Sequence, residues 1–335
     1  MAKIVAGIAT VHSPHVSTLP EQWDLHAQRD RNNPDIDFEG LARAARPEIH
    51  AELASEVYRN KYDRCNRAID ELSSALLEAK PDVVVIIGDD QHEMFLNDCI
   101  PAFAIFRGEE ILDIPEDLAT MDPSIRAADW ARHVRGGEAY PCDAELGRHL
   151  TAQLSQADFD VAQLSRQGEG RGIGHAFSFI RIRLMREHLI PMVPIFVNCF
   201  YPPNQPTPAR CYAFGKALGR AIESWDPNKR VAIAASGGLS HFVIDETLDY
   251  QVIRGLIEKR ADILTQLPVE KLVSGTSEIR NWIVAAAALE AFDMELVDYT
   301  AAYRSAAGTG CGMGFARWNA VSASAEKGRL QSSIA

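Results

Sequence analysis

Short apolar segments recur along the chain, and stretches of helical period separate them. The apolar segments span residues 4–10, 83–87, 159–165, 190–200 and 231–235. Segments of this length and composition are typical of strands that are covered on both faces. Helical period is found in residues 143–155, 177–187 and 209–224, and in most of the chain from 242 to about 292. This alternation predicts a single α/β domain in which helices flank a mostly parallel central sheet.

A long polar region separates the first two predicted strands. Residues 17–33 have the composition of a loop, and residues from about 35 to 79 are charge-rich with a helical period. This predicts a helical insertion that ends before Pro81. A glycine-containing loop is expected near residues 303–314. The domain is expected to span residues 1–321, with residues 322–335 as a flexible tail.

Composition and charge narrow the class of protein. The chain has 335 residues, of which 47% are hydrophobic, and a formal net charge of −12. The negative charge disfavours nucleic acid and anionic membranes as partners. No apolar run reaches the length of a membrane-spanning helix, and the first residues do not resemble a signal peptide. Six cysteines without C-x-x-C spacing suit a reducing compartment, so we expect a cytoplasmic protein.

Histidines stand at the ends of several predicted strands and loops. His12 and His15 follow the first strand, His92 follows the strand 83–87, His175 lies in a glycine-rich loop, and His241 follows the strand 231–235. Ligands of open α/β sheets bind outside the carboxyl ends of the strands. We therefore expect these histidines to lie near one another, in a binding site.

Such a cluster favours metal chemistry. Imidazole is a common ligand of first-row transition metals, and two histidines with one carboxylate leave open positions on ferrous iron. Histidines that do not bind the metal are suited to acid–base catalysis. Zinc-dependent hydrolysis uses the same residue types and stays an alternative. Serine catalysis is disfavoured because the chain has no G-x-S-x-G motif.

Six motifs, in this order, carry a resemblance to a known family: GIATVHSPH, VVVIIGDDQHE, GIGHAFSF, VNCFYPP, SGGLSHF and SGTSEIRNW. Together they resemble the class III extradiol dioxygenases, the group of the protocatechuate 4,5-dioxygenase beta subunit. The chain is most similar to members that act alone on lignin-derived aromatics such as 3-O-methylgallate or a biphenyl catechol. The resemblance implies an Fe(II) cofactor, a small aromatic substrate and incorporation of both atoms of O2.

The resemblance also implies roles for individual residues. His12 matches the first iron ligand of the family, and Glu278 matches the carboxylate ligand. His241 matches the catalytic histidine that handles the proton of the substrate hydroxyl. His175 matches a second active-site histidine near the substrate.

The second iron histidine is less clearly placed by the motif. Ungapped alignment puts Gln91 at the ligand position, whereas a one-residue bulge would bring in His92. We favour His92 because imidazole binds iron better than a neutral amide. Asp89, Asp90 and Gln91 are then expected around the ligands, orienting an imidazole. His15 is expected either to line the site or to serve as a hydrogen-bonded loop residue.

Substrate contacts are expected from several residues near the matched motifs. The candidates are Arg280, Tyr303, Arg304 and Ser305, with Arg171 as a further cation for a substrate carboxylate. Ordinary salt bridges are the alternative role of these arginines.

The helical insertion suggests how the site is covered. The beta subunit of protocatechuate 4,5-dioxygenase works with a small helical partner, and the insertion at about 35–79 is expected to replace it. This predicts a homodimer or higher homo-oligomer without a separate small subunit. A surface helix pair remote from the site is the alternative. A non-catalytic binding protein of the same fold is a further alternative to an enzyme.

Overall fold

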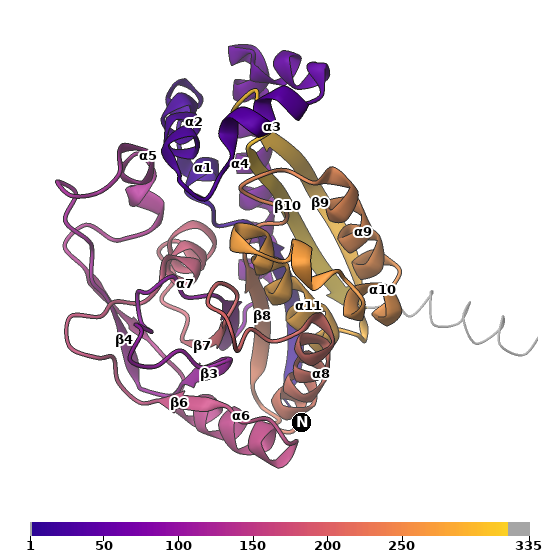
Figure 1. The fold of residues 1–335 in the computed structure, drawn as a ribbon. Helices are drawn as coiled ribbons and strands as arrows, with labels where there is room; N and C mark the ends of the chain where they lie inside the picture. Colours follow the sequence, from indigo (N-terminus) through magenta and orange to yellow (C-terminus); the bar gives the residue numbers. More distant parts are fainter. Residues whose placement is uncertain (1, 321–335) are drawn as a thin grey trace, which may run out of the picture.

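A single eight-stranded sheet forms the centre of the molecule (Figure 1). The computed structural model describes residues 2–320. The strand order is β6-β3-β7-β2-β8-β1-β10-β9. In chain order the strands are β1 (Lys3–Thr10), β2 (Val83–Gly88), β3 (Phe103–Phe106), β6 (Ala162–Leu164), β7 (Met192–Val197), β8 (Arg230–Ser236), β9 (Phe292–Tyr303) and β10 (Gly310–Ala320). A separate hairpin consists of β4 (Glu110–Asp113) and β5 (Glu138–Pro141).

The middle of the sheet is parallel, as the sequence pattern predicts. Strand β8 pairs in parallel with both β1 and β2, and β2 pairs in parallel with β7. Strand β3 runs antiparallel to β7 but parallel to β6, and at the other edge β1, β10 and β9 pair antiparallel. The predicted fold class, a single α/β domain with a mostly parallel sheet, is confirmed.

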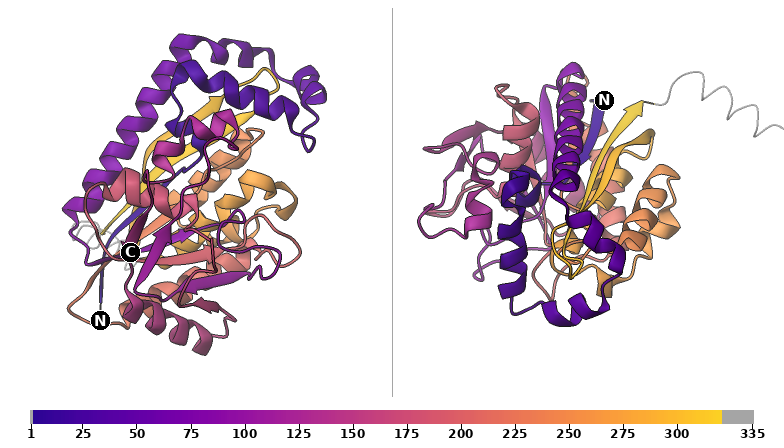
Figure 2. Two further views of the ribbon diagram at one scale, coloured as in Figure 1. Left: turned by 90° about the vertical axis from the view of Figure 1, so that its left-hand side faces the viewer. Right: turned by 90° about the horizontal axis from the view of Figure 1, so that it is seen from above.

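Helices cover both faces of this sheet (Figures 1 and 2). One face packs against α4 (Ser55–Glu78), α7 (His175–Phe179) and the π-helical turn Ile180–Met185. The other face packs against α6 (Ala144–Gln156), α8 (Pro208–Glu223), α11 (Ile279–Ala288) and, at β9, α9 (Glu246–Ile257); α10 (Ala261–Thr265) packs on α8 and α9. Within β2 the side chains of Val83, Val85 and Ile87 enter one core, and those of Val84 and Ile86 enter the other. This two-sided burial explains why the strand is apolar throughout.

The long hairpin β9–β10 occupies a region where the sequence analysis expects a loop at 303–314. The actual loop is short, and residues from Gly310 onward belong to β10. Added Cβ atoms would lie 2.2 Å from Ala302 O at Gly310 and 2.2 Å from Asp249 Oδ2 at Gly312. The glycines therefore permit close packing of a buried strand, which from sequence has the composition of a loop.

Most of the polar N-terminal region is helical. It contains α1 (Pro14–Ser17), the 3-10 turn Pro20–Gln22, α2 (Trp23–Asn32), α3 (Phe38–Ala44) and the 3-10 segment Pro47–Leu53 before α4. The predicted helical insertion at 35–79 is present, but α2 falls in the predicted loop. Its buried face consists of Trp23, His26 and Asp30, which have helical spacing. Two of these three residues are polar, so no apolar period marks the helix.

Short helical turns complete the described chain. They are α5 (Pro123–Arg126) and the 3-10 turns Asp129–Ala131, Val269–Lys271 and Ser274–Glu278. Among residues 2–320, no helix combines the length and apolar character that a membrane span requires. The tail predicted for residues 322–335 lies outside the described residues.

Candidate functional site

The carboxyl ends of the parallel strands bring distant polar residues together. His12 follows β1, Asp89 directly follows β2, and Ser236 ends β8. Glu278 comes from the 3-10 turn that precedes α11. Because β1, β2 and β8 are parallel neighbours, their ends lie at the same edge of the sheet.

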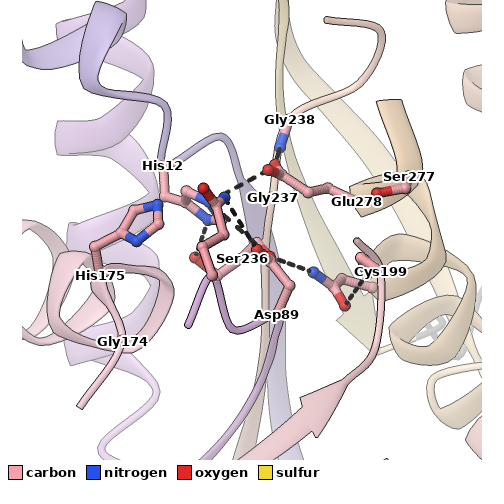
Figure 3. Close-up of polar contacts among 12 residues, drawn as sticks. His12, Asp89, Gly174, His175, Cys199, Ser236, Gly237, Gly238, Ser277 and Glu278 are labelled. Atoms are coloured by element: carbon pink, nitrogen blue, oxygen red, sulfur yellow. Dashed lines mark hydrogen bonds and ion pairs between the residues drawn. The ribbon is translucent and has the colours of Figure 1, made fainter. Parts of the chain in front are cut away.

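His12, Asp89 and Glu278 form a buried cluster with the composition of a metal site. One potential ligand atom from each residue lies within 4.8 Å of the other two. His12 Nε2 is 3.6 Å from Glu278 Oε1 and 4.0 Å from Asp89 Oδ1. Figure 3 shows the three side chains directed toward one another, with Ser236 beside His12. Imidazole and carboxylate are ligands of divalent first-row metals, so this donor set fits such an ion.

Neighbouring groups hold the three side chains in place. His12 Nδ1 is 3.0 Å from Ser236 Oγ, so the ring is oriented with Nε2 toward the carboxylates. The amide of Asn281 donates to Asp89 Oδ1 at 3.1 Å, and the backbone N–H of Gly238 donates to Glu278 Oε2 at 2.6 Å. His12 Nε2 is buried without a hydrogen-bond partner in the described chain. A buried, unpartnered ring nitrogen that faces two carboxylates fits the role of a metal ligand.

The electrostatics of the cluster also fit a cation. Burial and the charge of Glu278 raise the pKa of Asp89 to about 7. Burial alone would raise the pKa of Glu278, but His241 and His12 outweigh it and the pKa is lowered. Burial alone would lower the pKa of His12, but Glu278 and Asp89 outweigh it and the pKa is raised. Two buried carboxylates this close are stabilised by a positive charge between them.

The structure does not bring His92 into this cluster. Strand β2 pairs with β7 and β8 in regular register, without the bulge that would re-aim the loop. Asp89, the first residue after the strand, therefore takes the position beside His12. His92 has a φ of +64°, and its ring stacks on Tyr201 at a centroid distance of 3.9 Å. In this structure the carboxylate of Asp89, and not the imidazole of His92, lies beside His12 and Glu278.

A cavity, described below, lies beside these ligands, and Gln91 is the one residue expected around them that lines it. The Gln91 amide donates to Asp89 Oδ2 at 3.4 Å. Asp90 instead accepts the backbone N–H groups of Met94 at 2.7 Å and Phe95 at 3.1 Å, which holds the loop after β2. His15 is fully buried, meets the ring of Trp23 edge-on at a centroid distance of 4.2 Å, and does not line the cavity.

His241 is fixed beside Glu278. Its Nδ1 donates to Leu239 O at 2.9 Å, so Nε2 is the ring nitrogen that can gain or lose a proton, and it lies 3.3 Å from Glu278 Oε1. The backbone N–H of His241 donates to Thr276 Oγ1 at 3.0 Å, and that of Thr276 donates to His241 O at 2.7 Å. Burial alone would lower the pKa of His241, but Cys311 and Glu278 outweigh it and the pKa is raised.

His175 is oriented by a carboxylate that the sequence analysis does not single out. Glu93 Oε1 accepts the backbone N–H of His175 at 2.9 Å and lies 2.5 Å from its Nδ1. The ring centroid of His175 is 4.8 Å from that of His12. A Cβ added at Gly174 would lie 2.6 Å from Glu93 Oε2, so this glycine gives the carboxylate its space. Glu93 lies within the VVVIIGDDQHE motif, but only the fold places it against His175.

A cavity of about 310 Å³ opens onto these groups. His12, His175, His241 and Glu278 all line it. Further lining comes from α2, from residues 116–132 and from two aromatic side chains, Phe200 and Phe242. No residue of the insertion at 35–79 lines this cavity. The N-terminal helical region contributes Arg29 of α2 instead.

Two arginines expected to bind substrate serve the packing of the chain. Arg280 is buried and donates to Pro206 O at 2.8 Å and Leu272 O at 3.0 Å. Arg304 forms a buried two-point ion pair with Asp30 at 2.7 and 2.8 Å. Neither lines the cavity. Their guanidinium groups are occupied by contacts within the chain, which a sequence motif does not show.

The other expected substrate contacts also lie outside the cavity. Tyr303 Oη donates to Glu246 Oε1 at 2.6 Å, and the hydroxyls of Ser305 and Thr309 are 2.7 Å apart. Arg171 pairs with Asp98 at 2.6 Å. The arginines that do line the cavity are Arg29 and Arg132, which the sequence analysis does not single out.

Fold and site together define an α/β protein with a candidate metal centre at the carboxyl edge of its sheet. A family model described as the catalytic LigB subunit of aromatic ring-opening dioxygenase matches residues 47–314. The chain belongs to this family. Asp89, His175, His241 and Glu278 lie within the matched range, and His12 precedes it.

Curated relatives carry names of ring-cleaving enzymes. A 2,3-dihydroxyphenylpropionate/2,3-dihydroxicinnamic acid 1,2-dioxygenase of Comamonas testosteroni is 28% identical over 176 residues, 52% of this chain and 48% of the relative. A protein of the same name from Rhodococcus is 26% identical over 181 residues, 53% of this chain and 49% of the relative. A gallate dioxygenase of Pseudomonas putida is 35% identical over 103 residues, 31% of this chain and 30% of the relative. The chain thus spans about half the length, or less, of these relatives.

Proposed function

We propose that this chain is a non-haem Fe(II)-dependent extradiol dioxygenase that opens the ring of a catecholic or gallate-type aromatic acid with O2. The observation that carries the proposal is that His12 and Glu278 of the buried cluster face the same cavity as His175 and His241. Membership of the ring-opening dioxygenase family and the names of the relatives support this reaction type.

The metal would be held by His12, Asp89 and Glu278. This set has one imidazole and two carboxylates, whereas the sequence analysis expected two imidazoles and one carboxylate. The extra carboxylate makes the site more negative, which suits a divalent cation. When bound, Fe(II) supplies adjacent positions for the paired oxygens of the substrate and for O2.

His241 and His175 would act as proton acceptor and proton donor in the reaction. His241 can exchange a proton only at Nε2, because Nδ1 donates to Leu239 O. It would take the proton of a substrate hydroxyl beside Glu278. His175, held by Glu93, would hold or deliver a proton from another wall of the cavity.

The candidate substrates are small aromatic acids: 3-O-methylgallate, gallate, protocatechuate and a lignin-derived biphenyl catechol. Two aromatic rings, Phe200 and Phe242, offer apolar contact for the substrate ring. The protein is further proposed to act as a homodimer or higher homo-oligomer without a small subunit. The proposal that no small subunit is needed is supported by α2, which belongs to the same chain and contributes Arg29 to the cavity wall.

Oxygen uptake by anaerobically purified protein tests the reaction. The protein is reloaded with Fe(II) or Zn(II) and offered each of the four substrates. We expect uptake and a yellow ring-opened product with Fe(II) only. Absence of uptake with every catechol, or activity with Zn(II) alone, would overturn the proposal. Activity that requires an added second subunit would overturn the proposed self-sufficiency.

Metal analysis tests the ligand set independently of activity. Asp89→Ala is expected to lose bound iron, and His92→Ala, the matched variant in the same loop, is expected to retain it. Loss of iron in the His92 variant with retention in the Asp89 variant would exclude the proposed set. Circular dichroism establishes that both variants fold.

A further inference from the structure

The cavity wall contains a buried guanidinium with unused donors. Arg132 is 7% exposed and lines the cavity. Its Nε has no hydrogen-bond partner in the described chain. Its Nη1 faces only the sulfur of Met121, at 4.0 Å, and its Nη2 is 3.4 Å from Glu116 Oε1. A buried donor without a good acceptor costs folding free energy. An oxygen atom of a bound ligand would supply the acceptor that this guanidinium lacks.

Hydrogen bonds to the carboxylate of Asp113 fix the loop that carries Arg132. Asp113 is buried, and its Oδ1 is 2.6 Å from His133 Nδ1. Its Oδ2 accepts the backbone N–H of Val134 at 2.8 Å and the hydroxyl of Tyr140 at 2.9 Å. The residues directly after Arg132 are thereby tied to the hairpin β4–β5. The guanidinium is presented by a fixed backbone, as a preorganised binding group requires.

A second cation shares this part of the cavity. Arg29 of α2 lines it, and its guanidinium makes no hydrogen bond or ion pair with another described residue. Burial lowers the pKa of Arg29, and the positive charges of Arg304 and Arg132 lower it further. The negative charge of Asp122 acts in the opposite direction and raises this pKa. Two like charges that influence each other favour an anion near both.

The two carboxylates near Arg132 do not give it a close acceptor. Glu93 is 4.0 Å from Arg132 Nη2, but its Oε1 is already used by His175. Glu116 is the nearest competitor, and its side chain is 54% exposed. Because Glu116 is half exposed and its contact with Arg132 Nη2 is long, at 3.4 Å, its side chain can turn to solvent and an incoming carboxylate can replace it.

We propose that Arg132 and Arg29 form a carboxylate subsite that binds the acid group of the aromatic substrate. This inference rests on the proposed function for the identity of the substrate ring. The planar guanidinium of Arg132 offers its two Nη groups, whose contacts within the chain are long, to the carboxylate oxygens. Arg132 lies 4.0 Å from Glu93, which contacts His175, and the ring of His175 lies beside that of His12, so the subsite and the candidate metal site belong to the same cavity. Substrates without an acid group lose this contact.

Binding of benzoate and benzamide tests the subsite without any reaction. The two ligands have a similar shape, and only benzoate carries a negative charge. Calorimetry is performed on the wild type, Arg132→Gln, Arg132→Lys and Arg29→Gln. Arg126→Gln serves as the control, since Arg126 lies in α5 nearby, is exposed and does not line the cavity.

We expect Arg132→Gln to weaken benzoate binding about 10- to 100-fold and to leave benzamide binding unchanged. Arg29→Gln should show a smaller loss of the same sign, and Arg132→Lys a partial one, because lysine keeps the charge but not the two-point geometry. The control should bind like the wild type. Equal losses for both ligands, or no loss for benzoate, would overturn the subsite. If Arg132→Gln does not fold, the Arg132→Lys and Arg29→Gln variants decide.

Kinetics separate this inference from the proposed function. The ratio of kcat/KM for protocatechuate to that for catechol, which lacks the acid group, should fall in Arg132→Gln. Ring opening with an unchanged ratio would refute the subsite and leave the dioxygenase. Charge-dependent benzoate binding without ring opening of any catechol would keep the subsite and refute the dioxygenase.

Discussion

Gly275 gives the ring of His241 its position, and an added methyl group there would displace the ring. A Cβ at residue 275 would lie 2.0 Å from His241 Cδ2 and 2.2 Å from Nε2. Since non-bonded atoms are normally about 3.5 Å or more apart, the ring would have to move by roughly 1.5 Å. A misplacement of about 1 Å can reduce a rate about 100-fold, so we expect Gly275→Ala to lower kcat by at least about that factor.

The assay is oxygen uptake at saturating catecholic acid, together with the iron content and the thermal unfolding of each variant. Val273→Ala is the control, because Val273 is 56% exposed in the same segment and should retain wild-type kcat. Iron should remain bound in Gly275→Ala, since the clash is with His241 and not with the proposed ligands. A folded, iron-loaded Gly275→Ala variant with wild-type kcat would refute the argued position and role of this ring.

Three further predictions concern other buried charges. Asp30→Ala leaves Arg304 buried without its partner, so the free energy of unfolding in urea should fall by about 3–5 kcal/mol, and a loss near zero would contradict this. Glu93→Gln removes the charge that orients His175, so kcat should fall about 100-fold with bound iron retained, and an unchanged kcat would argue against an acid–base role of this pair. Burial raises the pKa of Asp249 to about 6, so its protonated form favours the folded state, and this contribution is lost as the pH rises from about 4 to 6. Over that range the wild type should lose about 2 kcal/mol relative to Asp249→Asn, and parallel urea-unfolding profiles of the two proteins would exclude the effect.

Residues 89–92, the loop after β2, could be placed from the sequence only in part. The apolar run 83–87 predicts a buried strand, and the polar residues after it predict a site at its end. The sequence left Gln91 and His92 as alternatives and favoured His92 on the assumption of a one-residue bulge. β2 keeps a regular register with β7 and β8 as far as Gly88, and the side chain that follows it beside His12 is Asp89, which neither alternative named; register is a property of three strands together. The motif alone therefore favoured an imidazole where the structure has the carboxylate of Asp89.

The arginines illustrate the same difference. Arg280 and Arg304 lie in or near matched motifs, but their guanidinium groups are occupied by buried contacts. Arg29 and Arg132 lie in segments without any recognisable motif and reach the cavity because α2 and residues 116–132 fold over it. Whether an arginine binds a ligand or the protein depends on which acceptors lie nearby, and these come from distant parts of the chain.

By itself the sequence determined the strands that are apolar throughout, the helices between them and the parallel α/β class, because these follow from local periodicity. Together with the rule for strand ends, it also brought His12, His175 and His241 to one expected site, and the family resemblance added Glu278; the structure has all four side chains at one cavity. Only the tertiary structure decided the β9–β10 hairpin, the position of Asp89, the Glu93–His175 pair and the two arginines of the cavity. Each of these depends on close packing, strand register or charge between residues far apart in the chain, which no local pattern records.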